Sequence, residues 1–208
     1  MSPWLSVVIP TVGRTTLVDT LDALDAQGDA LLDGVEVIVV GDTFGGMTAQ
    51  LQEVREHVAC ERMLGRYRFL ECDGGQHMYG QPQRTAGAHA ARGEWVWFGQ
   101  DDNVATEHAL ESIYCATRSP LSGLLIFRWV SPWREVIWRW PDLQLGNIDA
   151  DCLVMRRDVA HAVRWGMRYE GDYDVAQAAH EFTGRAEIDW QTPVVSVARP
   201  DNHHRWWR

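Results

Sequence analysis

Residues 5–10 read LSVVIP, a short run of aliphatic and β-branched side chains that ends at a proline. A run of this kind, without alternating polar residues, predicts a β-strand that is buried on both faces. Two similar runs follow, VEVIVV at 35–40 and EWVWF at 94–98, and segments with helical spacing lie between them. Doubly buried strands that alternate with helices predict an α/β fold with a mostly parallel sheet covered by helices.

The same patterns assign the other elements. Thr16 and Thr106 stand where a helix cap is expected, each ahead of apolar residues at helical spacing. Further helices are predicted at 48–58, 83–92, 158–165 and 172–182, and further strands at 67–72, 122–129, 148–155, 188–190 and 194–197. No repeat or linker interrupts the 208 residues, so we predict a single domain.

The composition is typical of a soluble globular protein, with 46% hydrophobic and 23% charged residues. No apolar run approaches the ~20 residues that cross a bilayer. The first residues, MSPW, have neither the basic segment nor the apolar stretch of a signal peptide. We therefore expect a cytoplasmic protein without a membrane partner.

Charge narrows the possible chemistry. The chain has 19 basic residues, all arginine, against 29 acidic ones, which gives a net charge of -10. This charge opposes bulk binding to nucleic acid. The lack of lysine excludes a lysine Schiff base and a P-loop lysine. Four separated cysteines without a CxxC pair are read as reduced thiols, namely Cys60, Cys72, Cys115 and Cys152.

Polar residues follow three of the predicted strands, at Pro10-Thr11, at Gly41-Asp42 and at 100–103. Ligands of open α/β sheets bind beyond the carboxyl ends of the strands. Asp101 and Asp102 repel each other unless a cation or hydrogen-bond donors compensate. Mg²⁺ or Mn²⁺ would provide that compensation and would bind phosphate oxygens as well. A solvated turn leading to a helix cap is the alternative for this pair.

Segments between residues 5 and 183 resemble, in order and spacing, the family-two glycosyltransferases of the GT-A fold. The resembling segments are 5–11 with Arg14, the second strand at 37–42, the helix and strand at 84–98, the DXD position at 100–102, and EGDYD at 170–174. The resemblance implies a GT-A sheet flanked by helices with a small acceptor-side subregion. It divides the single domain into a nucleotide-sugar-binding half, 1–103, and an acceptor-side half, 104–208.

Three positions depart from the family pattern. Gln100 replaces the first DXD carboxylate, Gly41 stands where many relatives have an acid, and Thr85 replaces a common asparagine. The departures leave the metal and nucleotide contacts to the remaining acids.

The resemblance also implies a reaction: metal-dependent, inverting transfer of a sugar from a nucleoside diphosphate sugar to an acceptor hydroxyl. The donor contacts would be Pro10, Thr11, Arg14, Asp42, Arg84 and Asp101. Asp102, for which we expect modest burial, would hold Mn²⁺ or Mg²⁺ together with His203 or His204. A disordered polar tail is the alternative for this histidine pair.

Asp172 is the predicted catalytic base, with Glu170 and Asp174 as substitutes and a helix N-cap as its structural alternative. On the acceptor side we predict Trp133, Asp149, Asp151 and Glu170. The alternating Asp149 and Asp151 should face the same way and hold sugar hydroxyls. The tryptophan-rich stretch 128–140 binds the acceptor, or else forms core or a homodimer surface.

The acceptor is predicted to be soluble: a small molecule, a protein or a modified DNA base. The lysine-free, tryptophan-rich composition suits an actinobacterium or one of its phages. Two other functions remain open, a nucleotidyltransferase and a non-catalytic nucleotide- or sugar-binding module. The segment 10–14 is a poor match to the glycine-rich basic loop of the former, and acids at the DXD and base positions oppose the latter.

Overall fold

The computed structural model describes residues 2–60, 65–75 and 78–199. Its N-terminal half alternates strands and helices as predicted. The elements of this half are β1 (Leu5–Thr11), α1 (Leu17–Asp25), α2 (Asp29–Leu32), β2 (Val35–Asp42), α3 (Ala49–Cys60), β3 (Tyr67–Cys72), α4 (Gln81–Ala90) and β4 (Trp95–Phe98).

The C-terminal half continues the same sheet with shorter connections. Its elements are β5 (Asn103–Ala105), α5 (Ala109–Thr117), β6 (Leu124–Val130), β7 (Val136–Ile137), the 3₁₀ helix η1 (Ala150–Cys152), β8 (Leu153–Arg156), α6 (Arg157–Ala162), α7 (Gly171–Phe182) and β9 (Asp189–Ala198).

Nine strands of the described residues form one sheet in the order β3-β2-β1-β4-β8-β6-β9-β5, with β7 paired to β6. The strands β3, β2, β1 and β4 are all parallel. Parallel pairing is what their nearly continuous apolar sequences predict, because such runs are typical of strands that are buried on both faces. Antiparallel pairs join β4 to β8, β8 to β6 and β9 to β5. The helix-covered α/β sheet is therefore confirmed, with its parallel character concentrated in the N-terminal half.

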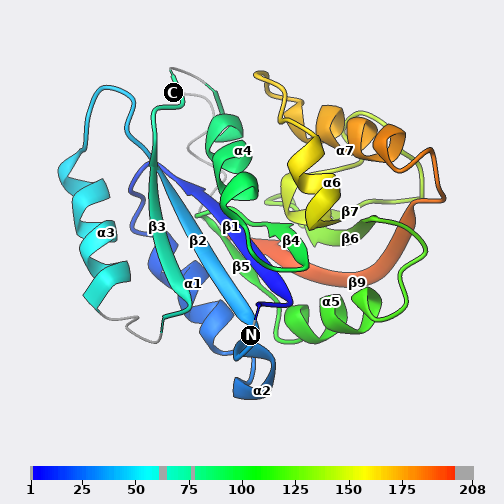
Figure 1. Ribbon diagram of the computed structural model, residues 1–208, viewed down its shortest axis with the longest axis horizontal. Helices are drawn as coiled ribbons and strands as arrows, with labels where there is room; N and C mark the ends of the chain where they lie inside the picture. Colours follow the sequence, from blue (N-terminus) through cyan, green and yellow to red (C-terminus); the bar gives the residue numbers. More distant parts are fainter. Residues whose placement is uncertain (1, 61–64, 76–77, 200–208) are drawn as a thin grey trace.

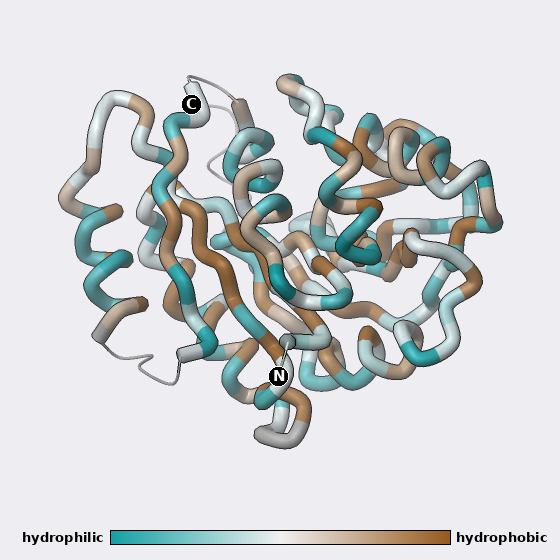
Figure 2. The backbone as a smooth tube through the Cα atoms, viewed as in Figure 1, coloured by the Kyte–Doolittle hydropathy of each residue, from teal (hydrophilic) through white to brown (hydrophobic). Residues whose placement is uncertain are grey.

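Each central strand contributes side chains to two cores. In β1, Val8 packs with α4, α6 and α7 on one face of the sheet, while Val7 and Ile9 pack with α1, α3 and α5 on the other. Figure 1 shows α4, α6 and α7 in front of the sheet. Figure 2 shows hydrophobic strands at the centre of the molecule and a mainly hydrophilic α3 at its edge. Burial on both faces explains why these strands read as continuous apolar runs.

Helix α4 lies very close to the sheet. A methyl group on Gly87 would overlap the side chain of Val8, so only glycine allows this approach. The residue before the helix, Gly80, has a left-handed backbone with φ 76°. Together these glycines bring the first turn of α4 to the carboxyl ends of β1 and β2.

The strand order reverses between β1 and β4. The chain leaves β1 for β2 on one side, and β4 is added on the other side after β3 and α4. A reversal of this kind leaves a crevice between the two connections, where ligands of open α/β sheets bind. The polar residues after β1, β2 and β4 all lie at this crevice.

Several predicted details are corrected. The strand expected at 148–155 is η1 followed by β8, and the two strands expected at 188–197 are one, β9. Thr106 is not a helix cap: its hydroxyl donates to the carbonyl of Val194 at 2.7 Å, and α5 begins three residues later. Thr16 precedes α1 but makes no side-chain cap. The short elements α2, β5 and β7 escaped prediction, because two to four residues carry no readable period.

The structure also bears on the cysteines and on membrane-spanning helices. Cys72, Cys115 and Cys152 are free thiols, as predicted. Within the described part of the chain, every helix is too short or too polar to span a bilayer.

Candidate active site

A cavity of about 910 Å³ opens at the crevice between β1 and β4. Its walls come from the ends of β1, β2 and β4, the first turn of α4, the β6–β7 hairpin, and the segments before η1 and α7. Eleven of the predicted site residues line it, namely Pro10, Thr11, Arg14, Asp42, Arg84, Asp101, Asp102, Trp133, Asp149, Glu170 and Asp172. His203 and His204 lie outside the described residues.

Arg14 holds the two aspartates that follow β4. Its Nη1 lies 2.8 Å from a carboxylate oxygen of Asp101 and 2.8 Å from one of Asp102. The Thr11 hydroxyl donates to the other Asp101 oxygen at 2.7 Å. Both aspartates are only 4% exposed, so the expected modest burial of Asp102 is wrong. After Asp102 the chain continues directly into β5, an edge strand of the same sheet that pairs with β9, instead of into a solvated turn.

Burial raises the pKa of Asp102 to about 6, and the charge of Asp101 adds to the effect. The Arg14 guanidinium opposes this rise without cancelling it. The pair therefore carries negative charge that one arginine does not fully neutralise.

Asp42 stands at the end of β2, on the opposite side of the cavity from β4. Its Oδ1 accepts hydrogen bonds from the backbone amides of Phe44 at 2.9 Å and Gly74 at 3.4 Å. Two backbone donors fix the orientation of this carboxylate towards the crevice.

Gln83 lies beside Asp42 and was not predicted. It lines the cavity and is 1% exposed, yet neither polar atom of its amide has a hydrogen-bond partner among the described residues. A methyl group on Gly74 would overlap the Gln83 amide, so the amide rests on the same backbone that binds Asp42. A buried amide without partners is costly unless a ligand supplies them.

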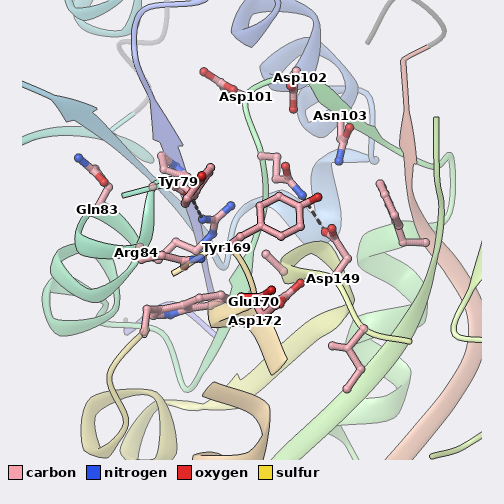
Figure 3. A pocket seen from close by; sticks show the side chains of 18 of the residues that line it. Tyr79, Gln83, Arg84, Asp101, Asp102, Asn103, Asp149, Tyr169, Glu170 and Asp172 are labelled. Carbon is pink, nitrogen blue, oxygen red and sulfur yellow. Dashed lines mark hydrogen bonds between the residues drawn. The ribbon is translucent and has the colours of Figure 1, made fainter. Parts of the chain in front are cut away.

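Arg84 occupies the floor of the cavity. Its Nη1 donates to the carbonyl of Tyr79 at 2.8 Å, and its guanidinium stacks over Trp165 at 5.1 Å from the ring centroid. Burial lowers the pKa of Arg84, while the charges of Asp149 and Asp172 act in the opposite direction. Figure 3 shows Arg84 between Gln83 on one side and the Asp149–Asp172 cluster on the other.

Gln100, the residue at the first DXD position, links two further acids. Its Nε2 donates to Asp149 at 2.7 Å and to Asp151 at 3.1 Å, and Asn103 also donates to Asp151. The two aspartates thus face the same amide, as their alternation predicts. Asp151 is almost fully buried and lies beneath the main cavity, not on its wall, so only Asp149 is placed to meet a ligand.

Asp172 lies in the first turn of α7. The helix begins at Gly171 with Glu170 as its N-cap, so the predicted capping role of Asp172 is wrong. Its Oδ1 accepts from the backbone amide of Tyr173 at 2.7 Å. Burial raises the pKa of Asp172 to about 7, the charge of Asp149 adds to this, and Arg84 opposes it. A carboxyl with this pKa can exchange a proton near neutral pH.

The two substitutes for Asp172 differ in their surroundings. Asp174 forms a bidentate ion pair with Arg168, which lowers the pKa of Asp174, and it does not line the cavity. Glu170 does line the cavity. The geometry therefore favours Asp172 over Asp174 as a base.

Aromatic side chains surround the carboxylates. Tyr79 and Tyr169 meet edge to face, with ring centroids 5.5 Å apart, and Figure 3 shows Tyr79 beside Arg84 and Tyr169 towards Asp149. Neither tyrosine could be predicted from the sequence, because each lies in a loop that only the fold brings to the site.

No family model matches the sequence, and no curated protein does. Solved structures do match. S. aureus TarS 1-349 is similar at 17% identity with a TM-score of 0.70, over 93% of this chain and 60% of that one. The mannosyltransferase PcManGT from Pyrobaculum calidifontis, in complex with GDP-Man and Mn²⁺, is similar at 16% identity with a TM-score of 0.68, over 98% of this chain and 59% of that one. This chain has the GT-A fold.

The chain spans about 60% of the length of these neighbours. A further TarS structure, in complex with UDP-GlcNAc, is 18% identical with a TM-score of 0.69, over 93% of this chain and 58% of that one. At such identities the likeness establishes the GT-A fold alone.

The residues at the end of β4 fit a divalent cation. Asp102 lines the cavity as a hard oxygen ligand, and burial together with the charge of Asp101 raises its pKa, an effect that a bound cation would oppose. Across residues 2–60, 65–75 and 78–199 there is no group of three or more histidine, cysteine or acidic side chains placed to hold an ion. An ion here would need ligand oxygens or residues of the C-terminal tail to complete its coordination.

Proposed function

We propose that the protein is a glycosyltransferase that moves a sugar from a nucleoside diphosphate sugar to an acceptor hydroxyl. One observation carries this proposal: a single cavity joins the Arg14–Asp101–Asp102 cluster to Asp172, a carboxyl whose pKa of about 7 suits a base. The similar structures support it, because TarS is described in complex with UDP-GlcNAc and PcManGT with GDP-Man and Mn²⁺.

The donor nucleotide would bind along the ends of β1 and β2. Pro10 and Thr11 form the wall, and Asp42 and the amide of Gln83 offer an acceptor and a donor to the nucleobase or ribose. Arg14 and Arg84 line the same cavity and would bind the diphosphate. Asp101, held by Thr11 and Arg14, fixes the position of the Arg14 guanidinium.

Asp102 would hold Mn²⁺ or Mg²⁺, with His203 or His204 and diphosphate oxygens as further ligands. The chemistry that a bound ion would supply there is stabilisation of the negative charge on the leaving diphosphate.

Asp172 would take the proton of the acceptor hydroxyl as that oxygen attacks the anomeric carbon. Its Oδ1 is fixed by the Tyr173 amide, which leaves Oδ2 to face the acceptor. With one carboxyl acting as base and none as nucleophile, displacement is direct and the anomeric centre inverts. Asp149 lies near enough to raise the pKa of Asp172 and would bind a sugar hydroxyl.

A panel of nucleotide sugars tests the proposal. We expect slow hydrolysis of one donor, UDP-GlcNAc and GDP-Man being the first two to try, with the rate dependent on Mn²⁺ or Mg²⁺. A nucleotidyltransferase would instead release pyrophosphate from a nucleoside triphosphate and a sugar phosphate. Binding of a nucleotide sugar without any turnover would leave only a non-catalytic module.

A further inference from the structure

The acceptor side of the cavity is rimmed by exposed aromatic rings. Trp133 on the β6–β7 hairpin is 67% exposed, Tyr169 before α7 is 66% exposed and Tyr79 before α4 is 50% exposed, and all three line the cavity. Rings held at a cavity mouth present faces on which a planar or ring-shaped ligand can stack. Leu145, also exposed and lining the cavity, extends this apolar rim.

Carboxylates stand behind the rings. The described part of the chain contributes seven acidic residues and two arginines to the cavity wall: Asp42, Asp101, Asp102, Glu135, Asp149, Glu170 and Asp172 against Arg14 and Arg84. Arg14 is bound to Asp101 and Asp102, and Arg84 is stacked on Trp165. The segment from 129 to 172 adds four of the seven acids to the wall and neither of the arginines.

This charge distribution disfavours an anionic acceptor. A phosphate, uronate or nucleic-acid strand bound between residues 129 and 172 would lie beside four acids of the wall, and the nearby Arg84 already offsets the charges of Asp149 and Asp172. Like charges at contact distance repel each other even in bulk water, and more strongly in a partly buried site. Glu135 is the only one of these four acids with a described ion pair, at 2.8 Å from Arg139, which itself does not line the cavity.

A ligand ring with apolar faces and several hydroxyl groups would complement both the aromatic rim and the carboxylates behind it. Its C–H faces stack on the aromatic rim, and its hydroxyls donate to the carboxylates, which can only accept. A purely aromatic acceptor would use the rings and leave the half-buried carboxylates Asp149, Glu170 and Asp172 without hydrogen-bond donors from the ligand. We infer that the acceptor is an uncharged saccharide. This inference rests on the proposed function for the transfer step, although saccharide binding itself needs no donor.

The cavity is large enough for both substrates. Cavities that bind small molecules measure about 300–1,000 Å³, and this one, at about 910 Å³, lies near the upper limit of that range. A nucleotide sugar on the β1–β2 side leaves space for one or two sugar rings beside Asp172.

Saturation-transfer NMR of the full chain tests the inference. The probes are methyl glycosides of glucose, galactose, mannose and N-acetylglucosamine, matched uronic acids and sugar 6-phosphates, a short DNA duplex and a serine-rich peptide. Spectra are recorded without nucleotide and again with UDP or GDP and Mn²⁺. We expect at least one neutral glycoside to bind, and its uronic acid and 6-phosphate to bind at least tenfold more weakly.

Three variants locate the binding. Trp133→Ala and Tyr169→Ala should each weaken the neutral glycoside roughly 5- to 150-fold, the range for loss of one stacked ring. Trp140→Ala is the matched control, because Trp140 is 52% exposed on the same stretch but does not line the cavity. It should bind as the unaltered protein does.

The inference is overturned if the anionic probes bind as well as the neutral ones, if only DNA or the peptide binds, or if no neutral glycoside binds in any condition. Equal effects of Trp133→Ala and Trp140→Ala would also overturn it. Hydrolysis of nucleotide sugars is a separate measurement. Donor cleavage without saccharide binding refutes only the inference, and saccharide binding without cleavage of any donor refutes only the proposed transfer.

Discussion

Replacing Asp172 by asparagine should abolish transfer while making the protein no less stable at alkaline pH. Asparagine keeps the Oδ1 atom that accepts from the Tyr173 amide. It cannot take a proton, so transfer should fall roughly 10²-fold or more. Because Glu170 and not Asp172 is the N-cap of α7, the substitution leaves the helix start intact.

The stability effect follows from the raised pKa. Asp172 has a folded pKa of about 7 against an ordinary value of 3.8, so ionising it in the folded protein costs at most about 4 kcal/mol. The folded state binds the Asp172 proton more tightly than the unfolded state does. The free energy of unfolding therefore falls as pH rises from about 4 to about 7, and it stays at the lower value above pH 7. The asparagine variant escapes this loss, so its Tm should match the parent near pH 4 and equal or exceed it at pH 8.

Asp174→Asn is the matched control in the same helical turn. Asp174 is paired with Arg168 outside the cavity, so its loss should remove at most about 1 kcal/mol, typical of a surface ion pair, and leave transfer intact. Thermal unfolding at pH 4 and pH 8 and a transfer assay with saturating donor measure both effects. Near-normal transfer by Asp172→Asn, or a lower Tm at pH 8 than the parent, would refute the reasoning.

Three further outcomes are expected. Asp102→Asn should remove the response of turnover to Mn²⁺. It should not lower Tm at pH 8, because the substitution also removes a buried charge. Metal-stimulated turnover at the level of the parent protein would contradict an ion site at Asp102. Asp42→Ala and Gln83→Leu should each raise the donor KM more than they lower kcat, measured by donor hydrolysis, whereas a selective fall in kcat would place them in the chemistry. Asp149→Asn should move the acidic limb of the kcat–pH profile to lower pH, since Asp149 raises the pKa of Asp172; an unmoved limb would exclude that coupling.

The parallel half of the sheet could be predicted from the sequence, because there the local preference for a strand agrees with burial in the folded protein. Residues 5–10 and 35–40 are buried on both faces, and their uninterrupted apolar runs show it directly. The polar residues that follow them had to lie at one edge, since parallel strands end on the same side. Asp42 and Asp101 could therefore be predicted to share a cavity, whereas Asp172, in the first turn of α7, was assigned to it by the family resemblance alone.

Other parts of the site depend on contacts that no local pattern reveals. Gln83 has the sequence pattern of an ordinary helical residue, and only the structure shows that it is buried against Gly74 with an unpaired amide. Asp172 looks like a cap by residue type, but Glu170 takes that position in space. The burial of Asp102 depends on β5 pairing with β9, more than 90 residues later in the chain.

Gln100 shows how a departure from a motif can be required by the surrounding charges. An acid at this position would lie within hydrogen-bond distance of Asp149 and Asp151, whose pKa values burial already raises. An amide instead donates to both and orients Asp149 towards the cavity. The acids at the ends of β4 and before η1 still outnumber the arginines Arg14 and Arg84. Since a buried carboxylate whose charge is only partly offset costs stability, the excess of acids favours a site that a cation and sugar hydroxyls complete when substrates bind.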